Sequence, residues 1–104
     1  PVVYKKFLSH KQEFLYKVIV ENLNKGIAEE LYRSDINPDI LARMRIATIM
    51  MSFDKNIFPH TQYKPLEVER HIVFHFLYGV ASPKGLKMIQ KYQQQRLENK
   101  IVKA

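Results

Sequence analysis

The sequence predicts an all-α domain of four helices joined by short loops. Apolar residues recur every three or four positions through most of the 104 residues, which is the period of helices packed on one side. Asn37-Pro38 and Ser82-Pro83 are helix-start signals, because Asn and Ser cap free backbone amides and Pro suits the first helical position. No segment alternates with the period of a strand. The length predicts one domain covering residues 1–104.

The first predicted helix covers residues 4–31, and the second covers residues 38–53. In the first, apolar residues step by four and form one core face, at Leu15, Ile19, Leu23, Ile27 and Leu31. The second begins at the Asn37 cap and is apolar nearly all round beyond Arg45. Residues 54–64, which follow the second predicted helix, are predicted to form a loop.

The third predicted helix, residues 65–81, is the segment around which the rest is organised, because it carries two apolar stripes. One stripe comprises Leu66, Val73, Phe76, Leu77 and Val80, and the second comprises Val68, Ile72, Phe76 and Gly79. A surface helix needs only one stripe, so the second predicts contact with another chain. The alternative is a central helix buried on all sides within one domain.

The fourth predicted helix runs from Pro83 to about residue 97, with Leu86, Ile89 and Tyr92 facing inward. The polar residues that follow are expected to fray. This part of the chain also carries most of the net charge of +7. Its lysines are spread out rather than stacked and accompany no recognition-helix motif, so the charge predicts a solvated face and not specific DNA contact.

The composition excludes several classes of protein. The chain has no cysteine, so disulfides, thiolate metal sites and cysteine nucleophiles are excluded. No apolar run approaches the roughly 20 residues that span a bilayer. The first residue is Pro and no signal-peptide pattern follows it, so we expect a cytoplasmic piece cut from a longer protein.

Glu67, His71 and His75 stand one helical turn apart, which is metal-ligand spacing. The sequence offers no obvious fourth ligand, and no Glu directly follows the first His as in zinc hydrolases. A polar row at a helix interface is therefore favoured over a metal site, and a small metal-dependent enzyme is the weakest hypothesis. The serines lack the context of a nucleophile. We expect no enzyme activity, no cofactor and no metal.

Methionines and aromatic residues provide the remaining candidate site. Such side chains adapt to irregular shapes and can line a pocket for an apolar ligand, although they more often form plain core. The set comprises Met44, Met50, Met51, Phe14, Phe53, Phe58, Phe74 and Tyr32.

Three runs together resemble the C-terminal, ligand-sensing part of TetR-type transcriptional regulators. They are NLNKGIAEELYRSDINPDILARMRI, IMMSFDKNIFP and HFLYGVASPKGLKMIQKY, and the matching positions are Gly26, residues 31–35, residues 37–40 and residues 76–79. The resemblance covers almost the whole chain but consists of loose positions. The N-terminal helix-turn-helix domain of that family and the first helices of its sensing domain have no counterpart in this sequence.

The resemblance implies a homodimer in which two helices of each subunit, here residues 38–53 and 65–81, form a four-helix bundle. The implied interface residues are Ile46, Ile49, Phe53, Val68, Ile72, His75, Phe76 and Gly79. It also implies a pocket for an unknown small apolar effector, lined by Phe14, Val18, Met44, Thr48, Met51 and Phe74. Effector binding would be coupled to operator release, and DNA would be contacted only through the missing domain. The alternative is a free-standing helical module that binds another protein.

Overall fold

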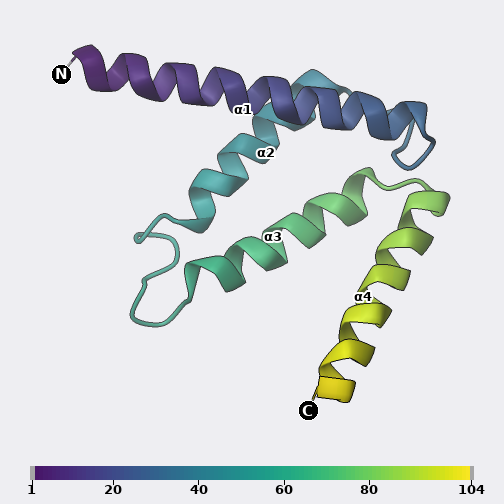
Figure 1. The fold of residues 1–104 in the computed structure, drawn as a ribbon. Coiled ribbons are helices and arrows are strands. Elements are labelled where there is room, and N and C mark those ends of the chain that lie inside the picture. The colour runs from purple at the N-terminus through teal and green to yellow at the C-terminus, as the bar shows by residue number, and fades with distance from the viewer. Residues whose placement is uncertain (1, 104) are drawn as a thin grey trace.

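The computed structural model describes the backbone of residues 2–103 and the side chains of residues 10–99. It contains α1 (Val2–Ala28), α2 (Pro38–Ser52), α3 (Pro65–Val80) and α4 (Pro83–Lys103), as Figure 1 shows. Within residues 2–103 there is no strand, and an isolated bridge joins Tyr32 to Ala81. The prediction of an all-α chain with four helices is confirmed.

The helices form an open, flat arrangement rather than a closed bundle. The helix α2 packs against both α1 and α3, whereas α4 turns away from α3 after a sharp corner (Figure 1). The principal extents are 49 × 39 × 20 Å, and the radius of gyration is 16.3 Å. A compact domain of this length has a radius of gyration of about 13 Å. The chain therefore spreads its helices over a wide area and encloses little between them.

The small core lies where α1 crosses α2 near the end of α3. Leu23, Ala42 and Val80 are almost completely buried there, one from each of these helices. The residues packed around them are Tyr16, Ile19, Val20, Tyr32, Ile36, Leu41 and Phe76. This core joins α1, α2 and α3, and none of its residues comes from α4.

Two of the predicted helix starts are confirmed in atomic detail. The Asn37 side chain accepts a hydrogen bond from the amide of Ile40 at 3.2 Å, and Pro38 is the first residue of α2. The Ser82 hydroxyl likewise accepts from the amide of Gly85 at 3.0 Å, directly before Pro83. Both caps satisfy amides that the helix itself leaves free.

Two predicted helix ends are wrong. The helix α1 ends at Ala28 rather than residue 31, because the amides of Leu31 and Tyr32 turn back to the carbonyl of Gly26 and Glu30 takes a left-handed φ of 62°. The helix α4 continues to Lys103 instead of fraying after residue 97. Its last residues are mainly Gln, Lys, Arg, Glu and Leu, which have high helix propensity without a core face.

The loop after α1 ties the two halves of the chain together. The amide of Arg33 donates to the carbonyl of Val80 at 2.8 Å, and its guanidinium donates to the carbonyl of Gly79 at 3.1 Å. The amide of Ser82 donates to the carbonyl of Leu31 at 3.0 Å. These contacts fix the corner between α3 and α4, and so set the direction in which α4 leaves.

Candidate binding surfaces

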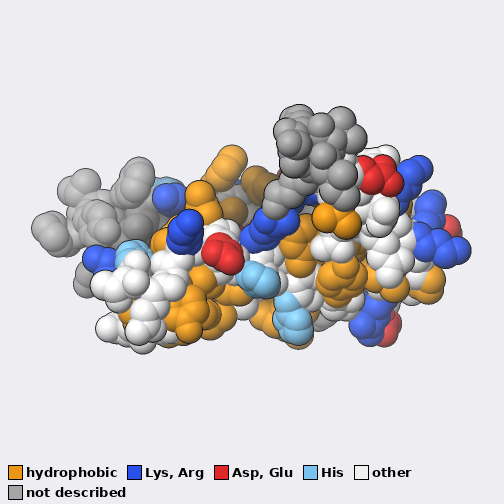
Figure 2. Space-filling view, turned by 90° about the horizontal axis from the view of Figure 1, so that it is seen from below, with side chains coloured by type: hydrophobic (Ala, Val, Ile, Leu, Met, Phe, Trp, Pro, Cys, Tyr) orange, Lys and Arg blue, Asp and Glu red, His pale blue; other side chains and the backbone are white. Residues whose placement is uncertain are grey.

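The chain exposes more surface than a compact monomer of its mass. Its accessible surface is 8314 Å², whereas a folded monomer of 12.4 kDa has about 6,100 Å². Among the side chains of residues 10–99, the buried apolar ones are Leu23, Ala42, Val68 and Val80 alone. Figure 2 shows hydrophobic side chains open to solvent between charged ones and histidines on one face. Such a surface is typical of a chain that binds partners.

The six predicted effector-binding residues are spread over exposed and half-buried positions of α1, α2 and α3. Phe14 is 71% exposed on α1, and Val18 and Met44 are also exposed. The half-buried Thr48 donates from its hydroxyl to the carbonyl of Arg45. Met51 and Phe74 are half-buried as well, and Phe74 lines hollows between α3 and α4. The assignment of all six residues to an effector pocket stays a prediction.

The eight predicted interface residues divide into three groups. Phe53, His75 and Gly79 are exposed, and beyond its chain neighbours and the backbone of α3 no described atom lies within 4 Å of a Cβ built on Gly79. Val68 is 8% exposed, and Phe76 packs on the core. Ile46, Ile49 and Ile72 are half-buried. His75 and Gly79 leave one side of α3 open, Phe53 lies at the end of α2, and their role as an interface stays a prediction.

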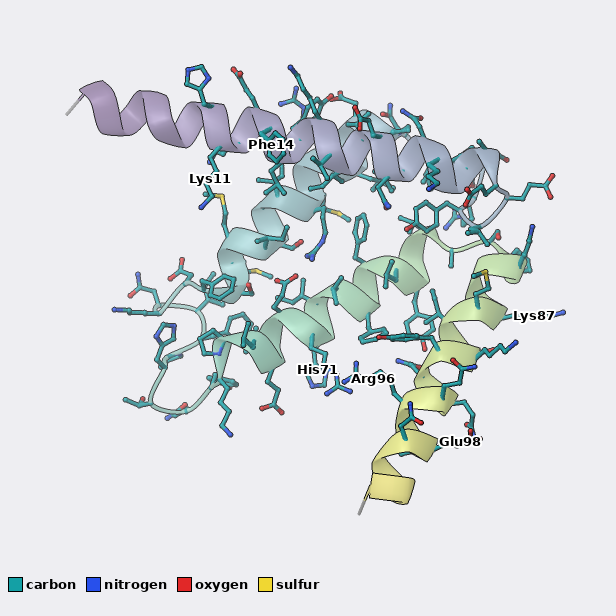
Figure 3. All side chains as sticks on the ribbon, viewed as in Figure 1. Lys11, Phe14, His71, Lys87, Arg96 and Glu98 are labelled. Atoms are coloured by element: carbon teal, nitrogen blue, oxygen red, sulfur yellow. The ribbon has the colours of Figure 1, made fainter. Side chains whose placement is uncertain are left out.

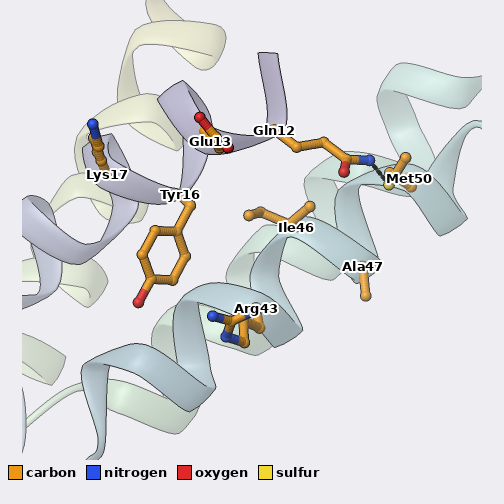
Figure 4. A pocket seen from close by; sticks show the side chains of 8 residues that line it. All are labelled: Gln12, Glu13, Tyr16, Lys17, Arg43, Ile46, Ala47 and Met50. Atoms are coloured by element: carbon orange, nitrogen blue, oxygen red, sulfur yellow. Dashed lines mark hydrogen bonds between the residues drawn. The ribbon is translucent and has the colours of Figure 1, made fainter. Parts of the chain in front are cut away.

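A hollow of about 540 Å³ lies between α1 and α2 (Figure 4). At one end the Tyr16 hydroxyl donates to Asp39 at 2.5 Å, and Arg43 pairs with Asp39 at 3.1 Å while lying over the Tyr16 ring. The hydrogen bond from Tyr16, followed by that from Arg43, lowers the pKa of Asp39. The remaining lining residues are Gln12, Glu13, Lys17, Ile46, Ala47 and Met50.

A second set of hollows lies in the angle between α3 and α4, and we call it the α3–α4 groove. Its apolar end, about 340 Å³, is lined by Leu31, Tyr32, Phe74, Leu77, Gly85, Met88, Ile89 and Tyr92. Its other end, which we call the mouth, is lined by Arg70, Phe74, Gln93, Arg96 and Leu97, with Leu66, Glu67 and His71 alongside. The groove is therefore open to solvent, apolar at one end and mainly cationic at the mouth.

Sequence reasoning missed both hollows, for different reasons. The i, i+4 spacing of Asp39 and Arg43 signals an ion pair, but nothing in the sequence places Tyr16 beside it. The α3–α4 groove depends on the direction in which α4 leaves the corner, which no periodic pattern records. Within the side chains that the structure describes, no three His, Asp or Glu residues gather as a metal site.

Comparisons with known proteins add no identification: no family model, curated protein or solved structure matches the chain. In the part of the chain that is described, no helix is long and apolar enough to cross a membrane. What the chain does must therefore be argued from its own surfaces.

Proposed function

We propose that this chain is the effector-sensing and dimerising part of a TetR-like bacterial transcriptional regulator. The observation that carries the proposal is the accessible surface, which exceeds that of a compact monomer by roughly 2,200 Å². A stable interface of ordinary size takes about 800 Å² from each partner. The excess can therefore supply a dimer interface and leave further surface for a ligand or another domain.

The open side of α3 is the part of this surface that we assign to the dimer. His75 and Gly79 are exposed on α3, and no atom outside the neighbouring residues and backbone of α3 fills the space above Gly79. Phe53, at the end of α2, is exposed as well. A glycine in a helix costs roughly 1 kcal/mol relative to Ala, and close approach of a second backbone would account for it. Pairing these faces from two copies would bring α2 and α3 of each subunit into one four-helix bundle.

In this function, the effector acts by shifting a conformational equilibrium. An effector bound between helices would favour one separation of the paired DNA-binding domains over another, and so weaken or permit operator binding. Such DNA-binding domains would be helix-turn-helix segments outside this sequence. The chain itself would contribute the dimer contacts and the ligand site.

Native mass spectrometry of the purified chain at tens of micromolar tests the dimer. We expect a mass of twice 12.4 kDa. The double variant His75→Glu, Gly79→Arg should shift the protein to monomer while its helical circular dichroism is kept, because both positions are exposed. Lys87→Glu, on the outer face of α4, is the matched control and should stay dimeric. A wild-type chain that remains monomeric, with no helix-turn-helix encoded upstream, would overturn the proposal.

The second candidate function is a free-standing helical module that binds another protein. The exposed apolar side chains of α1 and α2, among them Phe14, Ile40 and Met44, favour it, since they would suit a protein partner equally well. The coding sequence upstream of Pro1 separates the two functions. A basic three-helix segment there supports the regulator, and its absence supports the module.

A further inference from the structure

We propose that the α3–α4 groove binds an organic anion with an apolar body, such as an aliphatic or aromatic carboxylate. This inference rests on the proposed function, for which it names the chemical class of the effector. The site is distinct from the α1–α2 hollow, where Lys17 lies with Glu13 and Arg43 is paired with Asp39, so that an anion would meet less unpaired positive charge there.

The apolar body would lie in the apolar end of the groove. Phe74 and Leu77 of α3 face Met88, Ile89 and Tyr92 of α4 across this space, and Gly85 closes it against the backbone of Leu31. Its volume of about 340 Å³ falls in the range of small-molecule sites, about 300–1,000 Å³. Met88 and Tyr92 are more than half exposed in the single chain, so an occupant would remove apolar surface from water.

The anionic group would lie at the mouth, between Arg70 of α3 and Arg96 of α4. Figure 3 shows Arg96 directed from α4 toward the His71 side of α3, whereas Lys87 points away from the groove. Among the side chains of residues 10–99, the ion pairs are Arg33–Asp35, Arg43–Asp39 and Arg45–Glu69, so neither Arg70 nor Arg96 has an acidic partner. Two guanidinium groups without partners suit a carboxylate, which accepts two hydrogen bonds from each fork.

Gln93 adds a directed donor beside these two arginines. The Tyr78 hydroxyl donates to Gln93 Oε1 at 2.7 Å, which holds the side-chain amide and leaves its Nε2 group to donate at the mouth. Glu67 and His71 line one part of the mouth, and Arg96 lines the adjacent part. Glu67 does not line the part that contains Arg96. The anion is therefore expected on the Arg96 side.

Isothermal titration calorimetry on the full chain tests the site, with decanoate below its micelle-forming concentration as the anionic probe. Decyltrimethylammonium, which has the same chain length and the opposite charge, should bind at least about tenfold more weakly. Arg70→Gln combined with Arg96→Gln should weaken decanoate binding about tenfold, since each arginine provides a charge-assisted hydrogen bond. Met88→Gln, at an exposed position of the apolar end, should weaken it severalfold.

The matched control is Lys87→Gln combined with Lys91→Gln, which removes the same charge from the outer face of α4. Decanoate affinity should stay within about twofold of the wild type, because neither lysine lines the groove. Equal affinity for the two probes, an unchanged affinity in the arginine variant, or no binding of decanoate would each overturn the inference. If the chain is a dimer but binds no decanoate, this inference fails and the proposed function still stands. If the chain is a monomer that binds decanoate, the proposed function fails.

Discussion

Gly85 of α4 lies directly against the carbonyl group of Leu31, so a Cβ built on Gly85 would overlap the Leu31 oxygen. The same oxygen accepts a hydrogen bond from the amide of Ser82 at 3.0 Å. One turn of loop and the first turn of α4 are thus in contact through backbone atoms. This contact fixes the corner from which α4 leaves, and therefore the width of the α3–α4 groove.

Gly85→Ala should destabilise the chain by about 1–3 kcal/mol, because the added methyl group meets backbone and not a flexible side chain. Urea denaturation followed by circular dichroism, at one fixed protein concentration, measures the change. Lys87→Ala, at an exposed position two residues further along α4, is the control. It should change stability by less than about 0.5 kcal/mol. A loss in Gly85→Ala no larger than that in Lys87→Ala would contradict this account of the corner.

Arg45 and Glu69 form the ion pair that joins α2 to α3, and both side chains are largely buried, 13% and 20% exposed. Arg45 Nη1 and Glu69 Oε2 have no hydrogen-bond partner. The ion pair therefore does not fully offset the free energy that burying the two charges costs. Arg45→Met alone should cost about 3 kcal/mol, because it leaves Glu69 charged and buried. Chemical denaturation of the variant measures this loss.

The double variant Arg45→Met, Glu69→Met is the informative comparison. It removes both charges from an interface that already contains the Phe76 ring beneath Arg45, and should lie within about 1 kcal/mol of the wild type. A double variant as unstable as the single one would show that the pair contributes stability that apolar packing cannot replace. The cycle separates the interaction from the cost of an unpaired charge.

Local chemistry explains which parts of the fold could be predicted. Asn37 and Ser82 each precede a proline, and both caps form as expected because the signal lies within four residues of sequence. The end of α1 was misplaced because Leu31 continues the apolar step of four, yet its amide bonds back to Gly26. A hydrophobic period therefore gives the core face of a helix more reliably than its last turn.

The candidate sites depend on the positions and angles of the helices relative to one another, and the hydrophobic periodicity of a sequence does not give these. Phe14 and Met44 are both apolar positions on helical stripes, but each is exposed on its own helix, and neither lines the hollows described above. Arg70 and Arg96 look like ordinary solvated charges in the sequence. Only the angle of α4 brings both to the mouth of one groove.

Asn37→Ala should destabilise the chain by about 1 kcal/mol, because it removes the acceptor for the Ile40 amide at the start of α2. Thermal denaturation at fixed concentration measures the loss. Asn24→Ala, at an exposed position within α1, is the control for the same substitution and should be neutral or slightly stabilising. A similar loss in both variants would mean that capping is not what Asn37 contributes.

The hydrogen bond between Tyr16 and Asp39 should make the stability of the chain depend on pH. The hydrogen bond from Tyr16, and then that from Arg43, lowers the pKa of Asp39 below its unfolded value. Asp39 therefore contributes stability above its ordinary pKa, which is about 3.9, and this contribution is lost as the pH falls through the lower folded value. At the alkaline end, the same hydrogen bond to Asp39 raises the pKa of Tyr16. Its contribution is complete below about pH 10 and is lost as the pH rises through the raised value.

Tyr16→Phe should weaken both pH effects, because it removes the hydroxyl that Asp39 accepts from. The carboxyl carbon of Asp39, followed by NMR from pH 2 to 6, should titrate at a higher pH in the variant than in the wild type. Arg43 still pairs with Asp39, so the pKa should not return fully to its unfolded value. An unchanged Asp39 titration in Tyr16→Phe would show that the ion pair alone sets this pKa, and that the contact between α1 and α2 at this end of the hollow adds no electrostatic coupling.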